Sequence, residues 1–181
     1  MKRGWVAAAA CLLVLAACSN SDDASTATSG TIDAGPAATA VGGVTPQGFD
    51  TIGLTIRDAT SSTHRFCMWL ADTSDKRDVG LMKVTDLGGK SGMLFNFEKD
   101  TNSAFYMFQT VMPLSIAFFA SDGSFVSSTD MVPCTSSNGD DCELYSATGT
   151  YRDAIEVPQG GLAALGIGPG SAIVDRGACP E

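Results

Sequence analysis

Residues 105–119 read "FYMFQTVMPLSIAFF", an apolar stretch without a charged side chain. It is too short to cross a bilayer as a helix, which takes about 20 apolar residues. Pro113 lies near its centre and lacks the N–H that a helix interior or a central strand would use. The stretch therefore predicts two core strands, residues 104–108 and 114–119, joined by a turn at residues 109–113. The side chains expected in the core are Phe105, Met107, Ile116 and Phe118.

Further strands are predicted on both sides of this stretch, where apolar and polar residues alternate or where β-branched and aromatic residues gather. They cover residues 51–57, 64–72, 92–97, 124–132, 153–157 and 171–175. Two short helices are expected, one capped by Thr73 and one near residues 160–166. The sequence thus predicts an α+β fold dominated by strands, with a curled antiparallel or mixed sheet or a partly open barrel.

The first twenty residues, "MKRGWVAAAACLLVLAACSN", have the organisation of an export signal. Lys2 and Arg3 precede a short apolar run, and small residues precede Cys18. This pattern resembles a bacterial lipoprotein signal, with cleavage before Cys18 and acyl lipids such as palmitate on that residue. A transmembrane anchor is the alternative, but the apolar run is shorter than a spanning helix needs. We expect a signal peptide at residues 1–17 and an extracytoplasmic protein held to the membrane through Cys18.

Residues 18–48 differ in composition from the rest of the chain. Small and polar residues dominate and bulky apolar residues are rare. Such a segment buries too little apolar surface to offset the entropy of ordering it. We therefore predict a flexible tether at residues 18–48 and a single folded domain at residues 49–181, which is long enough to form a core.

The charge balance argues against a nucleic-acid partner. The chain has 11 basic and 20 acidic residues, a net charge of −9. Removal of Lys2 and Arg3 with the signal would leave nine basic residues, and hence a net charge of −11. An acidic surface repels phosphate backbones and anionic lipid headgroups. The membrane partnership predicted above would thus depend on the lipid at Cys18.

Four cysteines remain once Cys11 has left with the signal and Cys18 carries lipid. An even number of thiols in an exported protein indicates disulfides. Four cysteines allow three pairings. An Asn-Gly turn lies midway in "CTSSNGDDC" (residues 134–142), so that the ends of this segment meet easily. The predicted pairs are Cys134 with Cys142 and Cys67 with Cys179.

The sequence contains no pattern that predicts a metal ion or a cofactor. The cysteines lack CxxC spacing, the acidic residues at 140–143 do not follow a calcium-loop pattern, and the six methionines after the signal are spread through apolar strands. "LGGKSG" (residues 87–92) lacks the first glycine of a phosphate loop. His64 has no serine elbow to serve, and we expect it to be exposed at a strand edge.

Several segments, in this order, resemble a bacterial and archaeal family called domain of unknown function 192. They are "ADTSDKRDVGLM", "GMLFNF", residues 105–119 followed by "SDG", "MVPC", "AIEVPQGG" and "IGPGSAIV". The resemblance covers about residues 52–175. It implies a compact, mostly β fold and brings no established activity.

The chain departs from the family pattern at polar positions. Phe108 and Gln109 stand where the family usually has Lys-Asn, and Ser115 and Ser171 stand where it usually has Asp. A charged site shared by the family would be lost or modified here. The strand junction nevertheless suggests a candidate site for ligand binding or for bracing the turn before Pro113. Its residues are Tyr106, Gln109, Thr110 and Ser115.

Two functions are consistent with these features. The first is a non-enzymatic binding or accessory module of the cell envelope, because no nucleophile–base pair, metal cluster or cofactor loop is evident. Its ligand, small-molecule or otherwise, is not specified by the sequence. The second is a hydrolase or transferase of the envelope that uses carboxylates such as Asp72, Asp86 or Glu156. Two carboxyl groups converging in one cleft would favour the second function.

Overall fold

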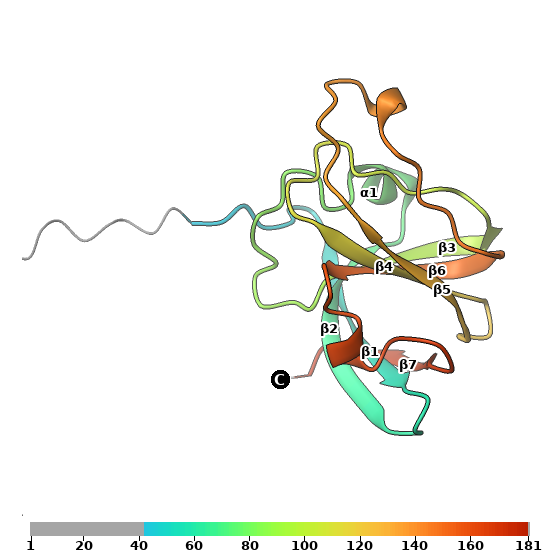
Figure 1. Cartoon of the computed structure of the whole chain (residues 1–181). Helices are drawn as coiled ribbons and strands as arrows, with labels where there is room; N and C mark the ends of the chain where they lie inside the picture. Colours follow the sequence, from blue (N-terminus) through green and yellow to red (C-terminus); the bar gives the residue numbers. More distant parts are fainter. Residues whose placement is uncertain (1–41, 181) are drawn as a thin grey trace, which may run out of the picture. The chain divides into compact units, whose positions relative to one another are not determined.

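The computed structural model describes residues 42–180, and seven strands make up most of its regular structure (Figure 1). The strands are β1 (Asp50–Arg57), β2 (Thr63–Ala71), β3 (Met93–Thr101), β4 (Leu114–Phe119), β5 (Phe125–Met131), β6 (Tyr151–Pro158) and β7 (Ala172–Gly177). The described helical elements are α1 (Ser74–Val79) and the 3₁₀ turns η1 (Gly139–Asp141) and η2 (Ala163–Leu165). The predicted signal peptide, Cys18 and the predicted tether as far as residue 41 lie outside the described residues.

All seven strands join in one sheet, in the order β5-β4-β6-β3-β2-β1-β7. Neighbouring strands are antiparallel except β2 and β3, which are parallel. A parallel pair needs a crossover connection, which α1 and the loop after it supply. The sheet does not close, although its edges β5 and β7 approach each other at the bridge Ser124–Ala172. The prediction of a strand-dominated fold with a mixed sheet is therefore confirmed.

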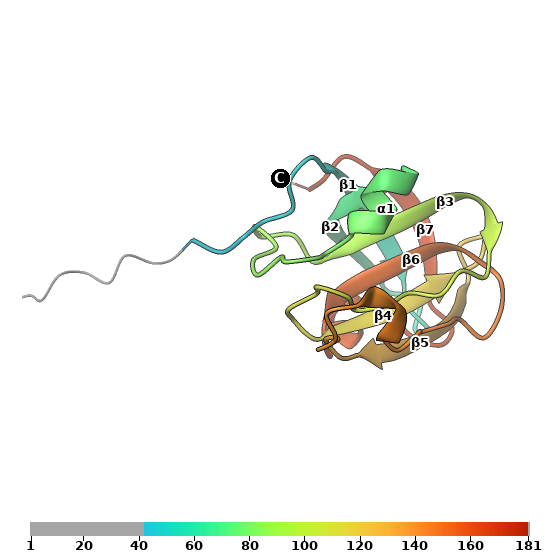
Figure 2. The same ribbon diagram turned by 90° about the horizontal axis from the view of Figure 1, so that it is seen from above.

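Two clusters of buried side chains lie on opposite faces of this sheet. The loop-side core contains Met93, Phe95, Ile116 and Phe118 and is covered by side chains such as Leu81, Met107 and Tyr145 from outside the strands. The curl core contains residues of β1, β2 and β7 together with residues of β4 and β6. Strands that are far apart in the sheet meet there, so the sheet must curl around this second core. Figure 2 shows α1 near β2 and β3.

Strand β4 is the second half of the stretch that opened the sequence analysis. All six of its residues are buried, because both of its faces are covered. Leu114, Ile116 and Phe118 point into the loop-side core, whereas Ala117 and Phe119 point into the curl core. The predicted burial of Met107, Ile116 and Phe118 is confirmed, and Phe105 is partly buried against the same core.

The predicted strand at residues 104–108 is wrong. Only Phe105 in this segment is paired among residues 42–180, in an isolated bridge to Tyr145 with N···O distances of 2.9 and 2.8 Å. The Met107 carbonyl accepts a hydrogen bond from the Cys134 N–H at 3.2 Å. The segment thus crosses the loop-side core, and its backbone is satisfied by a neighbouring loop. Apolar composition indicated burial correctly but did not identify the hydrogen-bond partner.

The helix predicted after Thr73 is confirmed as α1, whereas the second predicted helix is shorter than expected. The Thr73 hydroxyl accepts a hydrogen bond from the Lys76 N–H at 3.3 Å, which is an N-cap contact. Near residues 160–166 the structure contains only the short 3₁₀ turn η2, which ends at Gly166 with φ 70°. Glycines on both sides leave too few helix-forming residues for a longer helix.

The described residues form two disulfides, Cys134–Cys142 and Cys67–Cys179, with Cα–Cα distances of 5.6 and 4.9 Å. The first closes a loop of nine residues, and the second ties β2 to the C-terminal end. Contacts at the other end of the domain begin before residue 49, because the Thr85 N–H donates to the Val44 carbonyl at 2.9 Å. Within the described part of the chain, no helix has the length and apolarity required to cross a membrane.

Candidate functional site

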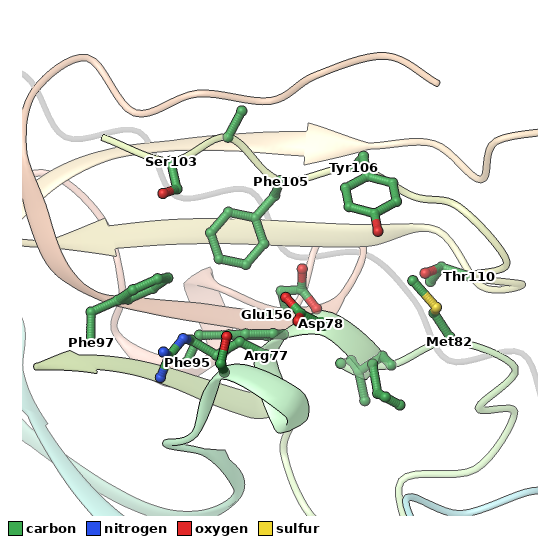
Figure 3. A pocket seen from close by; sticks show the side chains of 15 residues that line it. Arg77, Asp78, Met82, Phe95, Phe97, Ser103, Phe105, Tyr106, Thr110 and Glu156 are labelled. Carbon is green, nitrogen blue, oxygen red and sulfur yellow. The ribbon is translucent and has the colours of Figure 1, made fainter. Parts of the chain in front are cut away.

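A pocket with a volume of about 350 Å³ lies on the loop side of the sheet (Figure 3). One wall comes from α1 and residues 80–82, and the other comes from residues 103–110. Phe95 and Phe97 of β3 and Glu156 of β6 come from the sheet. Because its walls come from segments far apart in the chain, the pocket exists only in the folded protein.

Glu156 is the buried acidic group of this pocket. It is 4 % exposed. Its register partners are Met93 of β3 and Ile116 of β4, so apolar side chains flank it on both neighbouring strands. No residue between 42 and 180 hydrogen-bonds its carboxyl group. Every fully buried side-chain nitrogen or oxygen in that range does have a partner, so the carboxyl group of Glu156 must retain contact with the open space of the pocket.

Burial raises the pKa of Glu156 from 4.5 to about 8. The cause is desolvation, because no neighbouring cation or donor compensates for the loss of water around the charged form. Near neutral pH the empty pocket therefore holds a protonated carboxylic acid. A buried carboxyl group with a strongly shifted pKa in a cleft is a typical feature of functional sites.

Aromatic rings form much of the pocket wall. The rings of Phe95 and Phe105 meet edge to face, with centroids 5.0 Å apart. Tyr106 lies at the rim, 40 % exposed, and its ring stacks on that of Phe108 at 6.4 Å. Gly139 packs against both of these rings: a Cβ atom added there would lie 3.4 Å from Phe108 and 3.6 Å from Tyr106. The loop closed by the short disulfide thus supports the rim of the pocket.

The α1 side of the pocket contributes two charged residues, Arg77 and Asp78. The Arg77 guanidinium donates to the Asn96 carbonyl at 2.9 Å and lies 4.8 Å from the ring centroid of Phe97. Asp78 is exposed. Gly80 follows with φ 48°, and a Cβ atom there would lie 3.1 Å from the Phe95 ring. A glycine is therefore required where the chain leaves α1 and passes over Phe95.

The structure separates the four residues that the sequence predicted as one site. Tyr106 and Thr110 line the pocket. The Gln109 side chain is exposed and makes no hydrogen bond among the described residues, whereas its carbonyl accepts from the Lys83 N–H at 2.8 Å. Leu114 and Ile116, the neighbours of Ser115 in β4, point into the loop-side core. Because side chains alternate along a strand, Ser115 points to the opposite face of the sheet.

Ser115 and Ser171 have structural contacts instead. The Ser115 hydroxyl donates to an Asp130 carboxyl oxygen and accepts from the Gly160 N–H at 2.9 Å. The Ser171 hydroxyl donates to the Gly168 carbonyl at 2.6 Å and accepts from the N–H of the same glycine at 3.1 Å. Both serines hold turns near the ends of strands. These departures from the family pattern thus lie outside the pocket.

The three candidate carboxylates also lie apart. Asp72 is exposed and pairs with Lys76 at 3.0 Å. Asp86 is exposed and accepts from the Gly88 N–H at 2.8 Å, which stabilises a turn. Of the three, Glu156 alone lines the pocket. The sequence did not single out Asp78, although it lies in the "SDKRDVGLM" motif, because its place in the wall of the same pocket as Glu156 depends on how α1 packs.

His64 is not fully exposed, contrary to expectation. Its side chain is 36 % exposed, and Nε2 lies 2.8 Å from an Asp58 carboxyl oxygen. That hydrogen bond is the main reason why the pKa of Asp58 is far below its usual value, and a hydrogen bond from Thr60 lowers it further. The His64 ring also packs so closely on Gly166 that a Cβ atom there would lie 2.5 Å from it. These contacts join the β1–β2 turn to η2, away from the pocket.

A second hollow, of about 620 Å³, contains Arg152 and Arg176. Both guanidinium groups are already paired, Arg152 with Asp100 at 2.8 Å and Arg176 with the buried Asp153. Asn96 also donates to Asp153, at 2.7 Å. Because both guanidinium groups already pair with a carboxylate, they would bind an anionic ligand less strongly than unpaired guanidinium groups would. Between residues 42 and 180, no three His, Cys, Asp or Glu side chains gather in a way that could hold a metal ion.

These features define a class of protein: a strand-dominated domain with a curled mixed sheet and an aromatic pocket over one buried acid. The chain belongs to the family DUF192, described as "Uncharacterized ACR, COG1430", whose model matches residues 55–174. No curated protein matches the sequence.

Two solved structures are similar to this chain. One is a "putative transcription regulator" from Sinorhizobium meliloti 1021, with 25% identity and a TM-score of 0.61, covering 70% of this chain and 94% of the other. The second is a protein of unknown function from Novosphingobium aromaticivorans DSM 12444. It has 28% identity and a TM-score of 0.58, and the match covers 75% of this chain and 94% of that one.

Proposed function

We propose that this chain is a ligand-binding module of the cell envelope, held at the extracytoplasmic face of a membrane by lipid on Cys18, and that its ligand occupies the pocket over Glu156. The observation that carries the proposal is the carboxyl group of Glu156, which is 4 % exposed, lacks a protein partner among the described residues and borders the pocket. A buried polar group without a partner destabilises the fold. A ligand that hydrogen-bonds this carboxyl group would remove that cost.

The shape and chemistry of the pocket also fit binding. Its volume of about 350 Å³ lies within the range of small-molecule sites, and aromatic walls around a few polar groups are typical of them. The proposed location is supported by the basic start, the short apolar run and Cys18. Two disulfides also favour an oxidising compartment.

A hydrolase or transferase is the second candidate function. Asp78 lines the same pocket as Glu156, so two carboxyl groups border one cavity. In such an enzyme the protonated Glu156 would act as general acid and Asp78 as its carboxylate partner. Asp78 is exposed, and no hydrogen bond among the described residues orients its carboxyl group toward Glu156. Binding without turnover therefore remains the function that we propose.

DNA binding is not part of the proposal, although one similar structure is described as a regulator of transcription. A net charge of −9 for the whole chain would repel the phosphate backbone. Export, as proposed here, would also separate the protein from the chromosome.

Native mass spectrometry of protein purified without denaturation tests the binding function. We expect an additional mass on the wild-type protein that disappears on denaturation. Met82→Trp should lose it, because Met82 lines the pocket and a larger side chain would fill the cavity. Asp86→Asn should keep it, because Asp86 is an exposed turn residue outside the pocket. A mass retained equally by Met82→Trp would place the ligand elsewhere and contradict the proposal.

A further inference from the structure

The charge state of Glu156 restricts which ligands suit this pocket. As a protonated acid, the carboxyl group can donate one hydrogen bond to a neutral acceptor; as a carboxylate, it can hold a cation. Met93 and Ile116 flank Glu156 on the two neighbouring strands, and neither side chain can donate a hydrogen bond. The carboxyl group therefore has no protein donor among residues 42–180. A ligand that brings a positive charge would supply the missing counter-ion, and an ammonium group with an N–H bond would supply the missing donor as well.

The walls of the pocket favour a cation as well. Phe95, Phe105 and Tyr106 line it, and the faces of aromatic rings attract ammonium groups. The pocket already contains one such contact, between Arg77 and the Phe97 ring at 4.8 Å. That guanidinium is occupied by the ring and by the Asn96 carbonyl. It therefore does not pair with Glu156, whose carboxyl group has no partner in the described part of the chain.

The remaining charges near Glu156 also favour a positive ligand. The titratable side chains that line the pocket with it are Arg77 and Asp78 from α1 and Tyr106 from the opposite wall. On β3 and β4 its register partners are apolar. Ionised Glu156 and Asp78 together outweigh Arg77 by one negative charge. The net charge of the chain, −9, adds a long-range attraction for cations.

We propose that the ligand is an organic ammonium, a primary amine or quaternary ammonium on a small apolar frame, whose nitrogen lies against the Glu156 carboxylate and whose frame contacts the Phe95 and Phe105 rings. This inference rests on the proposed binding function and specifies the class of ligand. An anion would add a negative charge beside Glu156 and Asp78, and a neutral acceptor would pair with the protonated acid without using the negative charge that the pocket can develop.

Binding of an ammonium requires Glu156 to lose its proton. The exchange is balanced: the carboxylic acid and the ammonium ion combine into an ion pair and release one proton to solvent. Affinity for an ammonium should therefore rise with pH below the pKa of Glu156, by up to about tenfold per pH unit. A neutral ligand that accepts a hydrogen bond from the acid would show the opposite trend.

Calorimetric titration with matched probes tests this inference. The probes are choline with its uncharged carbon analogue 3,3-dimethylbutan-1-ol, benzylamine with benzyl alcohol, and benzoate as the anion. We expect both ammonium probes to bind more tightly than their neutral partners. At pH values well below the pKa of Glu156, titrations in buffers of different ionisation enthalpy should show release of close to one proton per ammonium bound.

Three variants complete the experiment. Glu156→Gln should weaken the ammonium probes by roughly ten- to hundredfold and leave the neutral probes nearly unchanged, because glutamine keeps the shape and a donor but not the charge. Glu98→Gln is the matched control, since it removes one exposed carboxylate outside this pocket and should change neither class. Met82→Trp should abolish binding of every probe that enters the pocket.

The outcomes separate the two proposals. Neutral probes or benzoate that bind as well as their ammonium partners, and are blocked by Met82→Trp, would overturn the ammonium class and keep the binding function. Ammonium binding that is unaffected by Glu156→Gln would also overturn the inference. Failure of both ammonium probes to bind the wild-type protein at millimolar concentration would overturn the ammonium class, and absence of any retained mass in the native mass spectrum as well would overturn the binding function.

Discussion

Ile116 of β4 lies directly opposite Glu156 of β6 across an antiparallel strand pair. Side chains in such register positions lie on the same face of the sheet, about 5 Å apart. A fully buried aliphatic side chain is thus the neighbour of a carboxyl group that has no hydrogen-bond partner among the residues that the structure describes. This arrangement connects the apolar stretch at residues 105–119 with the pocket, because β4 contributes to the dry surroundings that raise the pKa of Glu156.

Glu156 should make the stability of the protein fall as pH rises. Below about pH 4.5 the carboxyl group is protonated in the folded and the unfolded chain, and folding is not affected by its charge. Between that pH and about 8 the unfolded chain releases the proton while the folded chain keeps it. The free energy of unfolding should then decrease by up to about 1.4 kcal/mol per pH unit.

Urea unfolding of the wild type and of Glu156→Gln over this pH range measures the effect. The variant lacks the titrating group, so its advantage over the wild type should grow from pH 5 to pH 8. A stability difference that is independent of pH would show that the carboxyl group ionises normally in the folded protein.

Phe118→Ala should destabilise the fold by roughly 3–5 kcal/mol, through lost burial and a residual cavity. The Phe118 side chain is 0 % exposed, and its ring lies 4.8 Å from that of Tyr151 and 5.8 Å from that of Phe105. Val111→Ala is the control from the same apolar stretch, because Val111 is 54 % exposed and should cost less than about 0.5 kcal/mol. Equal denaturation midpoints for the two variants would contradict the core assignment of β4.

Gln109→Gly should stabilise the protein by up to about 1 kcal/mol. Gln109 has φ 54°, a conformation that glycine adopts without a steric penalty, and its contact with Lys83 is made by the backbone. Thermal unfolding measures the change. Gln159→Gly is the control, because Gln159 is exposed without a positive φ and should lose stability from the added chain entropy. A lower melting temperature for Gln109→Gly would show that its side chain braces the turn after all.

Removal of the short disulfide should cost about 2.5 kcal/mol in the chain-entropy model for a nine-residue loop. The double variant Cys134→Ser/Cys142→Ser should also loosen the pocket rim, because Gly139 of that loop packs against Tyr106 and Phe108. Hydrogen exchange should increase at the amides of residues 105–110 while remaining slow in β1 and β2. Unchanged exchange at these amides would show that the loop does not support the rim.

Cys18→Ala should leave the protein unlipidated and unprocessed at this site, because in the proposed anchor the cysteine is both the acceptor of the lipid and part of the cleavage signal. Metabolic labelling with a fatty-acid probe should mark the wild-type protein and not the variant. Equal labelling of the two proteins would exclude the proposed anchor.

Strand content and the position of α1 could be predicted because they depend on local patterns. Alternation in residues 51–57 and the N-cap at Thr73 are properties of neighbouring residues, and β1 and α1 appear where these patterns place them. Residues 104–108 have an equally apolar composition, but their backbone pairs with Tyr145 and Cys134 from a loop. The period of the apolar residues cannot reveal which distant segment supplies a hydrogen-bond partner.

The site was harder to predict than the fold. Asp72, Asp86 and Glu156 are equivalent acidic residues in the sequence, and tertiary packing alone distinguishes the buried one from the two in the solvent. Gln109 and Ser115 were grouped with Tyr106 and Thr110 because they are close in sequence. Backbone turning exposes Gln109, and strand alternation turns Ser115 to the other face of the sheet.

The sequence by itself determined that this chain would form strands round an apolar core, that one short helix would follow Thr73, and that the chain belongs to its family. These are consequences of local propensity and of the order of motifs along the chain. Only the tertiary structure decided that Glu156 lines one pocket together with Asp78, Phe105 and Tyr106. The reason is physical: the pKa of a carboxyl group depends on the water, charges and donors within a few ångströms, and folding brings those neighbours from distant parts of the chain.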